Sequence, residues 1–210
     1  MLSIDHIVEK YRSLGGAGGV AVTAEEADSF RRNLIAKPRV AQIGIYLWLF
    51  SSFERSLPLW GATLGEPADV FWRVFLENWS TSEGLWPLRK LILSTLRERA
   101  AQLSPIGFMG SSDRAFYDSL PDPVIVFRGC DRRRVRSLPW TTDREIAEFF
   151  ARGSRFGPQR DPVIARAEIA KADIFFVSVD RKESEVILDP YRIKSLLLPK
   201  RPGDHFKPDP

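Results

Sequence analysis

The chain has 210 residues, of which 44% are hydrophobic and 28% charged, a composition typical of soluble globular proteins and unlike that of disordered chains. Its net charge of +4 permits an anionic ligand or partner, but so small a surplus does not by itself indicate nucleic-acid binding. The single cysteine, Cys130, excludes an intrachain disulfide, and the two histidines, His6 and His205, lie too far apart in sequence to suggest a zinc site.

The N-terminal segment predicts neither Sec export nor membrane insertion. Asp5 and Glu9 fall where a signal peptide needs an uncharged apolar core, so we expect a cytoplasmic protein, or one delivered into a target cell by another route. The most apolar stretch, residues 40–50, is interrupted by Gln42 and is too short to cross a bilayer. It therefore predicts a buried helix.

The first half of the chain shows helical periodicity. One apolar stripe near the N-terminus consists of Ile4, Ile7, Val8 and Tyr11. The glycine-rich residues 15–19 would end this helix and form a linker, because they lack both the preceding strand and the spacing of a phosphate-binding loop.

Three further segments predict helices by their capping residues and apolar spacing. Thr23 and Glu26 have the spacing of a capping box at the start of the second helix. Residues 67–79 and 87–103 each begin with proline, which a first helical turn tolerates, and continue with apolar residues three and four positions apart.

After residue 120 the pattern changes to short apolar runs that predict strands. These runs are separated by Asp, Pro, Gly or Lys and cover residues 124–127, 163–169, 174–179, 185–188 and 193–198. Between the first two lies a short strand that runs into a helix, for which Thr142 and Glu145 have capping-box spacing. We expect Ile146, Phe149 and Phe150 to face inward from this helix.

The order of these elements predicts an α+β protein, because strands and helices do not alternate as they do in a doubly wound sheet. We expect a helical N-terminal region at residues 1–105, a β-rich region at 106–200 and a loose tail at 201–210. No linker rich in Pro, Gly or Ser separates the two regions, which favours one compact unit with the helical region as a cap. Residues 151–162 would form either a surface loop or a mobile lid.

Two glutamates one residue apart stand where the strand at 185–188 begins. In a strand, Glu183 and Glu185 would project to one face and Ser184 to the other. Their repulsion would raise the pKa of at least one carboxylate unless a positive group lies nearby. Taken alone, the pair predicts no more than two solvated acids on an exposed strand.

Three features of the β-rich region occur in a fixed order. Arg128 and Gly129 close the first apolar strand, the sequence SLPWTTDREIAEFFA follows, and ESEVIL comes last. Each has an ordinary structural explanation by itself, since a strand-end arginine is usually solvated and WTTD is explained by helix capping. Their order and spacing carry the functional hypothesis.

Across residues 122–198 these three motifs resemble the arginine-serine-glutamate class of ADP-ribosyltransferases, in particular its small bacterial members. The resemblance implies a split β-sandwich of two small sheets after the helical region. It also implies that NAD is the substrate and that ADP-ribose is transferred from it. Breaking the bond between nicotinamide and ribose develops positive charge on the sugar, which a fixed carboxylate stabilises.

The resemblance assigns a role to each matching residue. Glu185 would be the catalytic carboxylate that bonds the ribose hydroxyl, and Glu183 would accept a proton from the incoming nucleophile. Arg128 would offer a charged fork to ribose or pyrophosphate oxygens, and Gly129 would let the backbone approach the nicotinamide amide. No metal is implied.

The middle motif departs from the family pattern. Pro139, Trp140 and Thr141 stand where the family has Ser-Thr-Ser, so only Thr141 keeps a hydroxyl, while Ser137 lies two residues upstream. Thr141 and Trp140 are the NAD-site residues that the resemblance predicts here. The loss of the first serine bears on how Glu185 is oriented.

By the same resemblance, glutamate at position 183 implies an arginine of a target protein as the acceptor, and a toxin or effector role. The alternatives are a catalytically weakened NAD-binding interaction module, an NAD glycohydrolase, and an enzyme that modifies nucleic acid at the same site. The nucleic-acid reading rests on an arginine-rich loop, which could equally be solvated or bind phosphates; it contains Arg132, Arg133, Arg134 and Arg136. We favour it less than a protein acceptor.

Overall fold

The computed structural model describes residues 2–15, 21–153 and 159–199. The chain divides into two compact units, Met1–Phe108 and Met109–Pro210, close to the boundary predicted at residue 105. The expected linker at residues 15–19, the centre of the expected lid and the expected tail fall almost entirely outside the described ranges. A cap-like packing of the helical region on the sheet stays a prediction.

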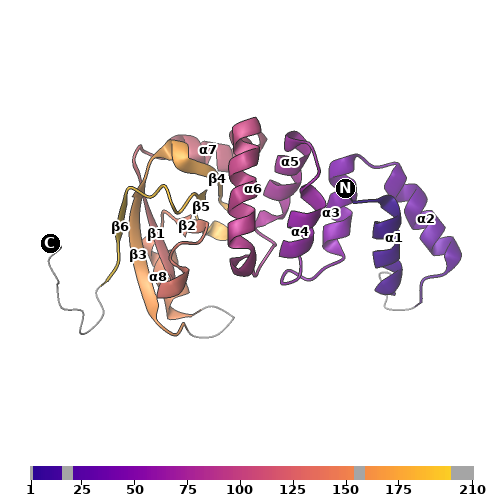
Figure 1. The fold of residues 1–210 in the computed structure, drawn as a ribbon, viewed down its shortest axis with the longest axis horizontal. Coiled ribbons are helices and arrows are strands. Elements are labelled where there is room, and N and C mark those ends of the chain that lie inside the picture. Colours follow the sequence, from indigo (N-terminus) through magenta and orange to yellow (C-terminus); the bar gives the residue numbers. More distant parts are fainter. Residues whose placement is uncertain (1, 16–20, 154–158, 200–210) are drawn as a thin grey trace. The chain divides into compact units, whose positions relative to one another are not determined.

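The first unit is helical, as the periodicity predicts (Figure 1). Its α-helices are α1 (Ile4–Ser13), α2 (Ala24–Ile35), α3 (Arg39–Trp48), α4 (Ser56–Thr63), α5 (Ala68–Trp79) and α6 (Arg89–Gln102). The predicted capping box of α2 is confirmed: Thr23 Oγ1 accepts a hydrogen bond from the Glu26 backbone N–H, and the Glu26 side chain accepts one from the Thr23 N–H. Helix α4 was not predicted, because it has neither a side-chain cap nor an apolar stripe on one face.

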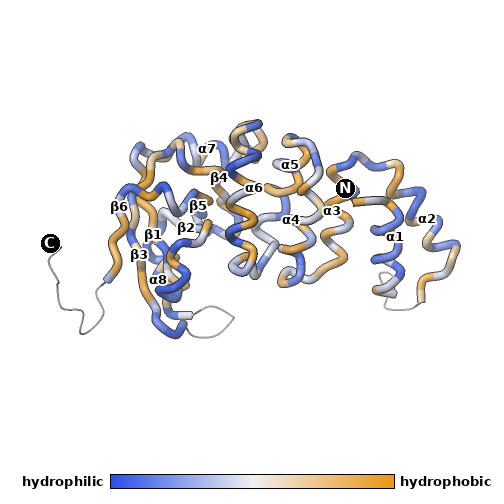
Figure 2. The backbone as a smooth tube through the Cα atoms, viewed as in Figure 1, coloured by the Kyte–Doolittle hydropathy of each residue, from blue (hydrophilic) through white to orange (hydrophobic). Residues whose placement is uncertain are grey.

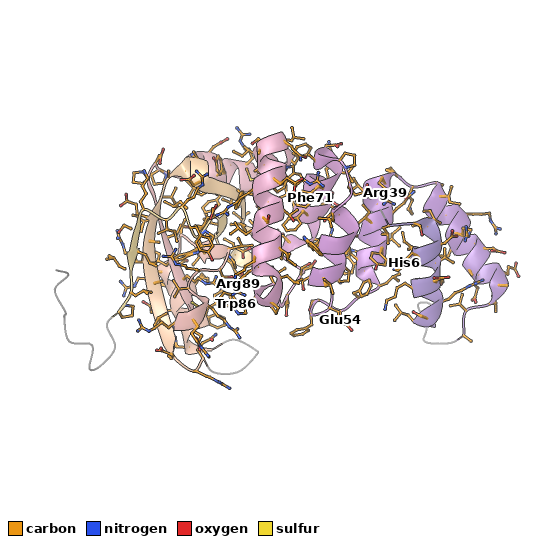
Figure 3. The ribbon with its side chains drawn as sticks, in the orientation of Figure 1. His6, Arg39, Glu54, Phe71, Trp86 and Arg89 are labelled. Atoms are coloured by element: carbon orange, nitrogen blue, oxygen red, sulfur yellow. The ribbon has the colours of Figure 1, made fainter. Side chains whose placement is uncertain are left out.

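Aromatic packing along α5 forms the core of the helical unit. Phe71 and Trp72 are fully buried, and Phe71 stacks on Phe75 with ring centroids 5.0 Å apart (Figure 3). The Trp72 indole N–H donates to the Leu103 carbonyl at 2.8 Å, which satisfies its one polar atom. Among the described helices, including α3, none has the length and apolar character needed to cross a membrane.

The second unit combines a sheet with two α-helices. Its elements are α7 (Ser111–Ser119), β1 (Val124–Asp131), β2 (Pro139–Thr141), α8 (Arg144–Arg152), β3 (Pro162–Ile169), β4 (Ile174–Ser178), β5 (Glu185–Leu188) and β6 (Ser195–Leu197). Hydrophobic residues recur along β1 and β3 (Figure 2) and bury one face of these strands. The chain is therefore an α+β protein, as predicted.

The described strands form one antiparallel sheet in the order β4-β5-β2-β1-β3-β6. Strands β1 and β3 pair along their whole length, from Val124 opposite Ile169 to Asp131 opposite Pro162. Strands β1 and β2 share only one register pair, Phe127 opposite Thr141. This single pair joins two three-stranded halves, and we call it the seam.

Three local predictions about this unit are wrong. Strand β1 continues to Asp131, so Arg128 lies within the strand and does not close it. Helix α8 is capped by Asp143, whose carboxylate accepts from the N–H groups of Glu145 and Ile146, and not by Thr142. Phe149 does not face inward: it is 60% exposed, because the helix packs through the small residues Ala147 and Ala151.

Candidate functional site

The two glutamates lie in a turn that leads into β5, and not together on a strand. Strand β5 begins at Glu185, whereas Glu183 has φ −92° and ψ −6°, a helical backbone conformation. The residues that flank Glu183 are left-handed, with φ 57° at Lys182 and 44° at Ser184. Non-glycine residues adopt such angles at an energetic cost, and they gather at functional sites. The expectation that strand alternation sets the direction of both carboxylates is therefore wrong.

Hydrogen bonds from separate elements hold this turn, residues 179–184. The Thr141 hydroxyl donates to the Glu183 carbonyl oxygen at 2.7 Å and accepts from the Asp143 N–H at 3.0 Å. One residue on, the Thr142 N–H donates to the Ser184 carbonyl at 3.2 Å. The last residue of β2 and the residue after it thus hold the two carbonyl groups that lie between Glu183 and Glu185.

Helix α7 anchors the other end of the turn. The Asp113 carboxylate accepts a hydrogen bond from the Val179 N–H at 2.9 Å. Burial raises the pKa of Asp113, the Val179 N–H opposes that rise, and the negative charge of Asp180 adds to it. Sequence reasoning missed Asp113, because nothing in its local pattern distinguishes it from an ordinary first-turn helical acid.

Arg128 is half-buried near Glu185 and bonds the protein's own backbone. Its Nε donates to the Arg134 carbonyl at 3.2 Å, and a second guanidinium nitrogen donates to the Pro139 carbonyl. Burial lowers the pKa of the guanidinium, while Cys130 and Glu185 act in the opposite direction. The arginine and the second glutamate therefore interact electrostatically across the seam.

Two predicted NAD-site residues have structural roles. Trp140 is 2% exposed, and its indole N–H donates to the Ser137 carbonyl at 3.1 Å. A Cβ at Gly129 would lie 1.6 Å from the Ala147 carbonyl oxygen, so glycine here lets α8 pack against β1. The space expected for a nicotinamide amide on that side of Gly129 is filled by helix α8.

The arginine-rich loop after β1 is largely engaged with the protein itself. Arg132 pairs with Asp161, with Nε and Oδ2 3.3 Å apart, and Arg133 donates to Asp131. Arg136 donates to the Pro190 carbonyl at 2.9 Å. The loop is thus neither a purely solvated segment nor an open basic patch.

Cys130, which follows Gly129 in β1, is a buried free thiol. Burial raises its pKa, and the charge of Arg128 only partly opposes the rise. A thiol in such a setting is a poor nucleophile, so Cys130 acts as a small packed residue of β1. Within the described parts of the chain, no group of His, Cys, Asp or Glu side chains has an arrangement that could hold a metal ion.

The structure therefore brings together four of the six predicted site residues. Arg128, Thr141, Glu183 and Glu185 surround the seam, and Thr141 is the register partner of both Phe127 and Glu185. The hydroxyl and the guanidinium bond the protein's own backbone, whereas the two carboxylates carried by the turn could stabilise positive charge that develops on a ligand beside them.

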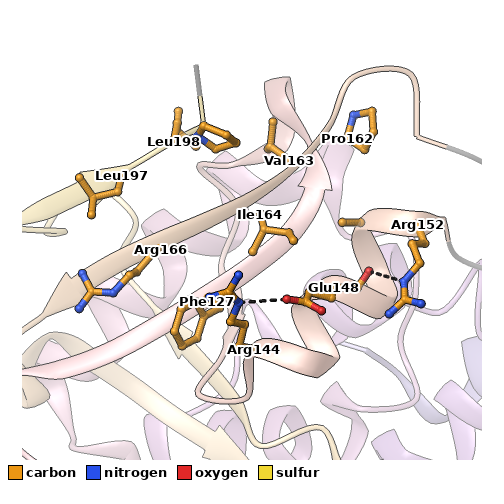
Figure 4. Close-up of a pocket in the computed structure, with 12 residues that line it drawn as sticks. Phe127, Arg144, Glu148, Arg152, Pro162, Val163, Ile164, Arg166, Leu197 and Leu198 are labelled. Atoms are coloured by element: carbon orange, nitrogen blue, oxygen red, sulfur yellow. Dashed lines mark hydrogen bonds and ion pairs between the residues drawn. The ribbon is translucent and has the colours of Figure 1, made fainter. Parts of the chain in front are cut away.

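A groove elsewhere on this unit does not include these four residues. It has a volume of about 750 Å³ and lies between α8, β3 and the end of β6 (Figure 4). Its lining consists of Phe127, Arg144, Glu148, Ala151, Arg152, Pro162, Val163, Ile164, Arg166, Leu197, Leu198 and Pro199. Sequence reasoning did not identify it, because its residues come from four segments that only the sheet brings together.

Comparison with known proteins does not assign the chain to a family. No protein-family model matches the chain, and no curated protein or solved structure matches it either. The residues around the seam are therefore the basis on which a function can be proposed.

Proposed function

We propose that the protein is a mono-ADP-ribosyltransferase that transfers ADP-ribose from NAD to an arginine of a protein target, in a toxin or effector role. The observation that carries this proposal is the gathering of Arg128, Thr141, Glu183 and Glu185 at the seam, from three segments of the chain. The near-division of the sheet at the seam is in keeping with the two-sheet split sandwich that the sequence resemblance implies.

The proposed chemistry depends on where positive charge develops. Cleavage of the nicotinamide–ribose bond leaves a cationic sugar, and the Glu185 carboxylate at the start of β5 stabilises it. Glu183 accepts the proton that the acceptor guanidinium loses when it attacks the sugar. The turn at residues 179–184 presents both acids from one rigid segment, and Thr141 replaces the missing serine hydroxyl by holding the backbone of that turn.

Arg128 has a positioning role in this proposal. Its bonds to the Arg134 and Pro139 carbonyls hold the segment between β1 and β2 in place, and the charge of Glu185 opposes the lowering of the Arg128 pKa by burial. The sequence-based expectation that its guanidinium binds NAD directly stays a prediction.

The test is transfer of label from NAD to an arginine-containing peptide. We expect labelled peptide with the unmodified protein and none with Glu185→Gln. We expect Glu183→Gln to release nicotinamide but to lose most of the transfer, because only the step that activates the acceptor needs its carboxylate. Glu145→Gln removes an exposed acid of α8 outside the seam and should leave transfer unchanged.

One observation favours a second candidate, an NAD-binding module without turnover. Pro139 has no hydroxyl to orient Glu185. Its carbonyl oxygen also accepts a hydrogen bond from the Arg128 guanidinium, so that N–H group is not available to NAD. This candidate predicts that NAD raises the melting temperature while no nicotinamide is released. Release of nicotinamide that depends on Glu185 would reject it.

A further inference from the structure

The groove defined above combines an apolar floor with the exposed end of an edge strand. Strand β6 ends the sheet order, and Leu197 and Leu198 at its end are 56% and 38% exposed. Phe127 and Ile164 continue the apolar lining toward α8 (Figure 4). Proteins usually cover consecutive exposed apolar residues on an edge strand, since such an edge pairs readily with another chain.

Arginines flank this apolar floor. Arg166 is exposed and is the direct cross-strand partner of Leu197, so the two side chains lie side by side on one face of the sheet. On α8, Arg144 pairs with Glu148 at 3.0 Å, and Arg152 Nε donates to the Glu148 carbonyl at 3.4 Å. Three arginines against one glutamate give the groove an excess of positive charge, and a guanidinium fork fits a carboxylate in two-point geometry.

We propose that this groove binds an acidic segment of a partner protein, extended beside β6. Apolar residues of this segment would contact Leu197 and the floor, while its Asp or Glu residues meet the Arg166 and Arg152 side chains that flank the floor. The backbone of the edge strand supplies further hydrogen-bonding groups. Nucleic acid fits less well, because the floor is apolar and the Glu148 carboxylate repels phosphate.

A row of register partners links the groove to the strand that carries the second glutamate. Register partners run in one row from Glu185 through Thr141, Phe127 and Arg166 to Leu197. With strands about 4.8 Å apart, Arg166 is roughly 14 Å from Glu185 along this row. A partner bound in the groove would thus lie within reach of the strand that carries the proposed catalytic acid; this last point rests on the proposed function, whereas the binding itself does not.

Fluorescence anisotropy with two synthetic peptides tests the proposal. One probe alternates Glu with Leu and Phe, and the other has Lys in place of every Glu. We expect the full chain to bind the acidic peptide, in a salt-sensitive manner, and to bind the basic peptide more weakly. Arg166→Glu should weaken acidic-peptide binding about tenfold or more and improve basic-peptide binding, since it reverses the charge that the peptide meets. Leu197→Ser should weaken binding of both.

The matched control is Lys90→Glu, which makes the same change of charge at an exposed residue of α6. This variant should bind both peptides like the unmodified chain. Circular dichroism establishes that each variant is folded. If Arg166→Glu does not fold, the proposal is tested by the binding of Leu197→Ser and by the salt dependence of binding to the unmodified chain. Failure of both peptides to bind, equal binding by Arg166→Glu, or stronger binding of a labelled single-stranded oligonucleotide would overturn the proposal. None of these readouts requires NAD, so they are independent of the transferase assay.

Discussion

The Thr141 hydroxyl donates a 2.7 Å hydrogen bond to the carbonyl oxygen of Glu183, across 42 positions of sequence. This bond ties the end of β2 to the turn at residues 179–184, and the same hydroxyl accepts from the Asp143 N–H. The start of α8 and the two acids are therefore fixed by one side chain.

Thr141→Val should lower the free energy of unfolding by about 1–2 kcal/mol, because it leaves a partly buried carbonyl and a partly buried N–H without their partner. Denaturant unfolding measures this loss. Thr142→Val is the matched control, since Thr142 bonds Ser184 through its backbone N–H, which valine keeps. Equal effects of the two changes would show that the Thr141 hydroxyl does not hold the turn.

Backbone strain at Ser184 predicts an unusual order of stabilities. At φ 44° an L side chain is strained, so Ser184→Gly should be more stable than Ser184→Ala by about 1 kcal/mol. At Ser195, an exposed residue of β6, the order should be reversed, because glycine weakens a strand. The comparison uses thermal or denaturant unfolding of the four variants, and alanine being the more stable residue at both positions would argue against a left-handed Ser184.

Gly129→Ala should cost about 3 kcal/mol or more of folding free energy, because its Cβ would overlap the backbone of Ala147 and α8 would have to move. Gly107→Ala is the control, since nothing lies within 4 Å of a Cβ built there. Urea unfolding monitored by circular dichroism gives both values. A tolerated Gly129→Ala would mean that α8 does not pack against β1 at this distance.

The Asp131 carboxylate should make the free energy of unfolding depend on pH in the acidic range. The Arg133 side chain donates to this carboxylate and lowers its pKa from 3.8 to about 2. Since the folded pKa lies below the ordinary value, the carboxylate stabilises the fold fully above about pH 4, and this contribution is lost as the pH falls through 2. The difference in unfolding free energy between the unmodified chain and Asp131→Asn should therefore shrink from about pH 5 to about pH 2.

Arg133→Gln supplies the control for this measurement, because it removes the side chain that lowers the Asp131 pKa most and keeps the Arg133 backbone N–H that also donates to the carboxylate. In the Arg133→Gln background the effect of Asp131→Asn at about pH 5 should be smaller than in the unmodified chain. A difference between the unmodified chain and Asp131→Asn that stays constant across the range would contradict the assignment.

Local patterns in the sequence predicted most helices and strands, since apolar periodicity is a short-range signal. The same patterns could not show that Glu183 lies outside β5, because left-handed residues at 182 and 184 depend on bonds from Thr141, Thr142 and Asp113. Nor could they show that Gly129 faces α8, which is a contact between distant segments. The interaction of Arg128 with Glu185 also joins distant segments, and only the strand order brings it about.

Release of nicotinamide from NAD by the unmodified chain and by Glu185→Gln tests the central claim most directly. The account predicts that the unmodified chain cleaves the nicotinamide–ribose bond and that Glu185→Gln does so about 10² to 10³ times more slowly, because the amide cannot stabilise the cationic sugar. Equal rates in the two proteins, or no release by the folded unmodified chain, would contradict it.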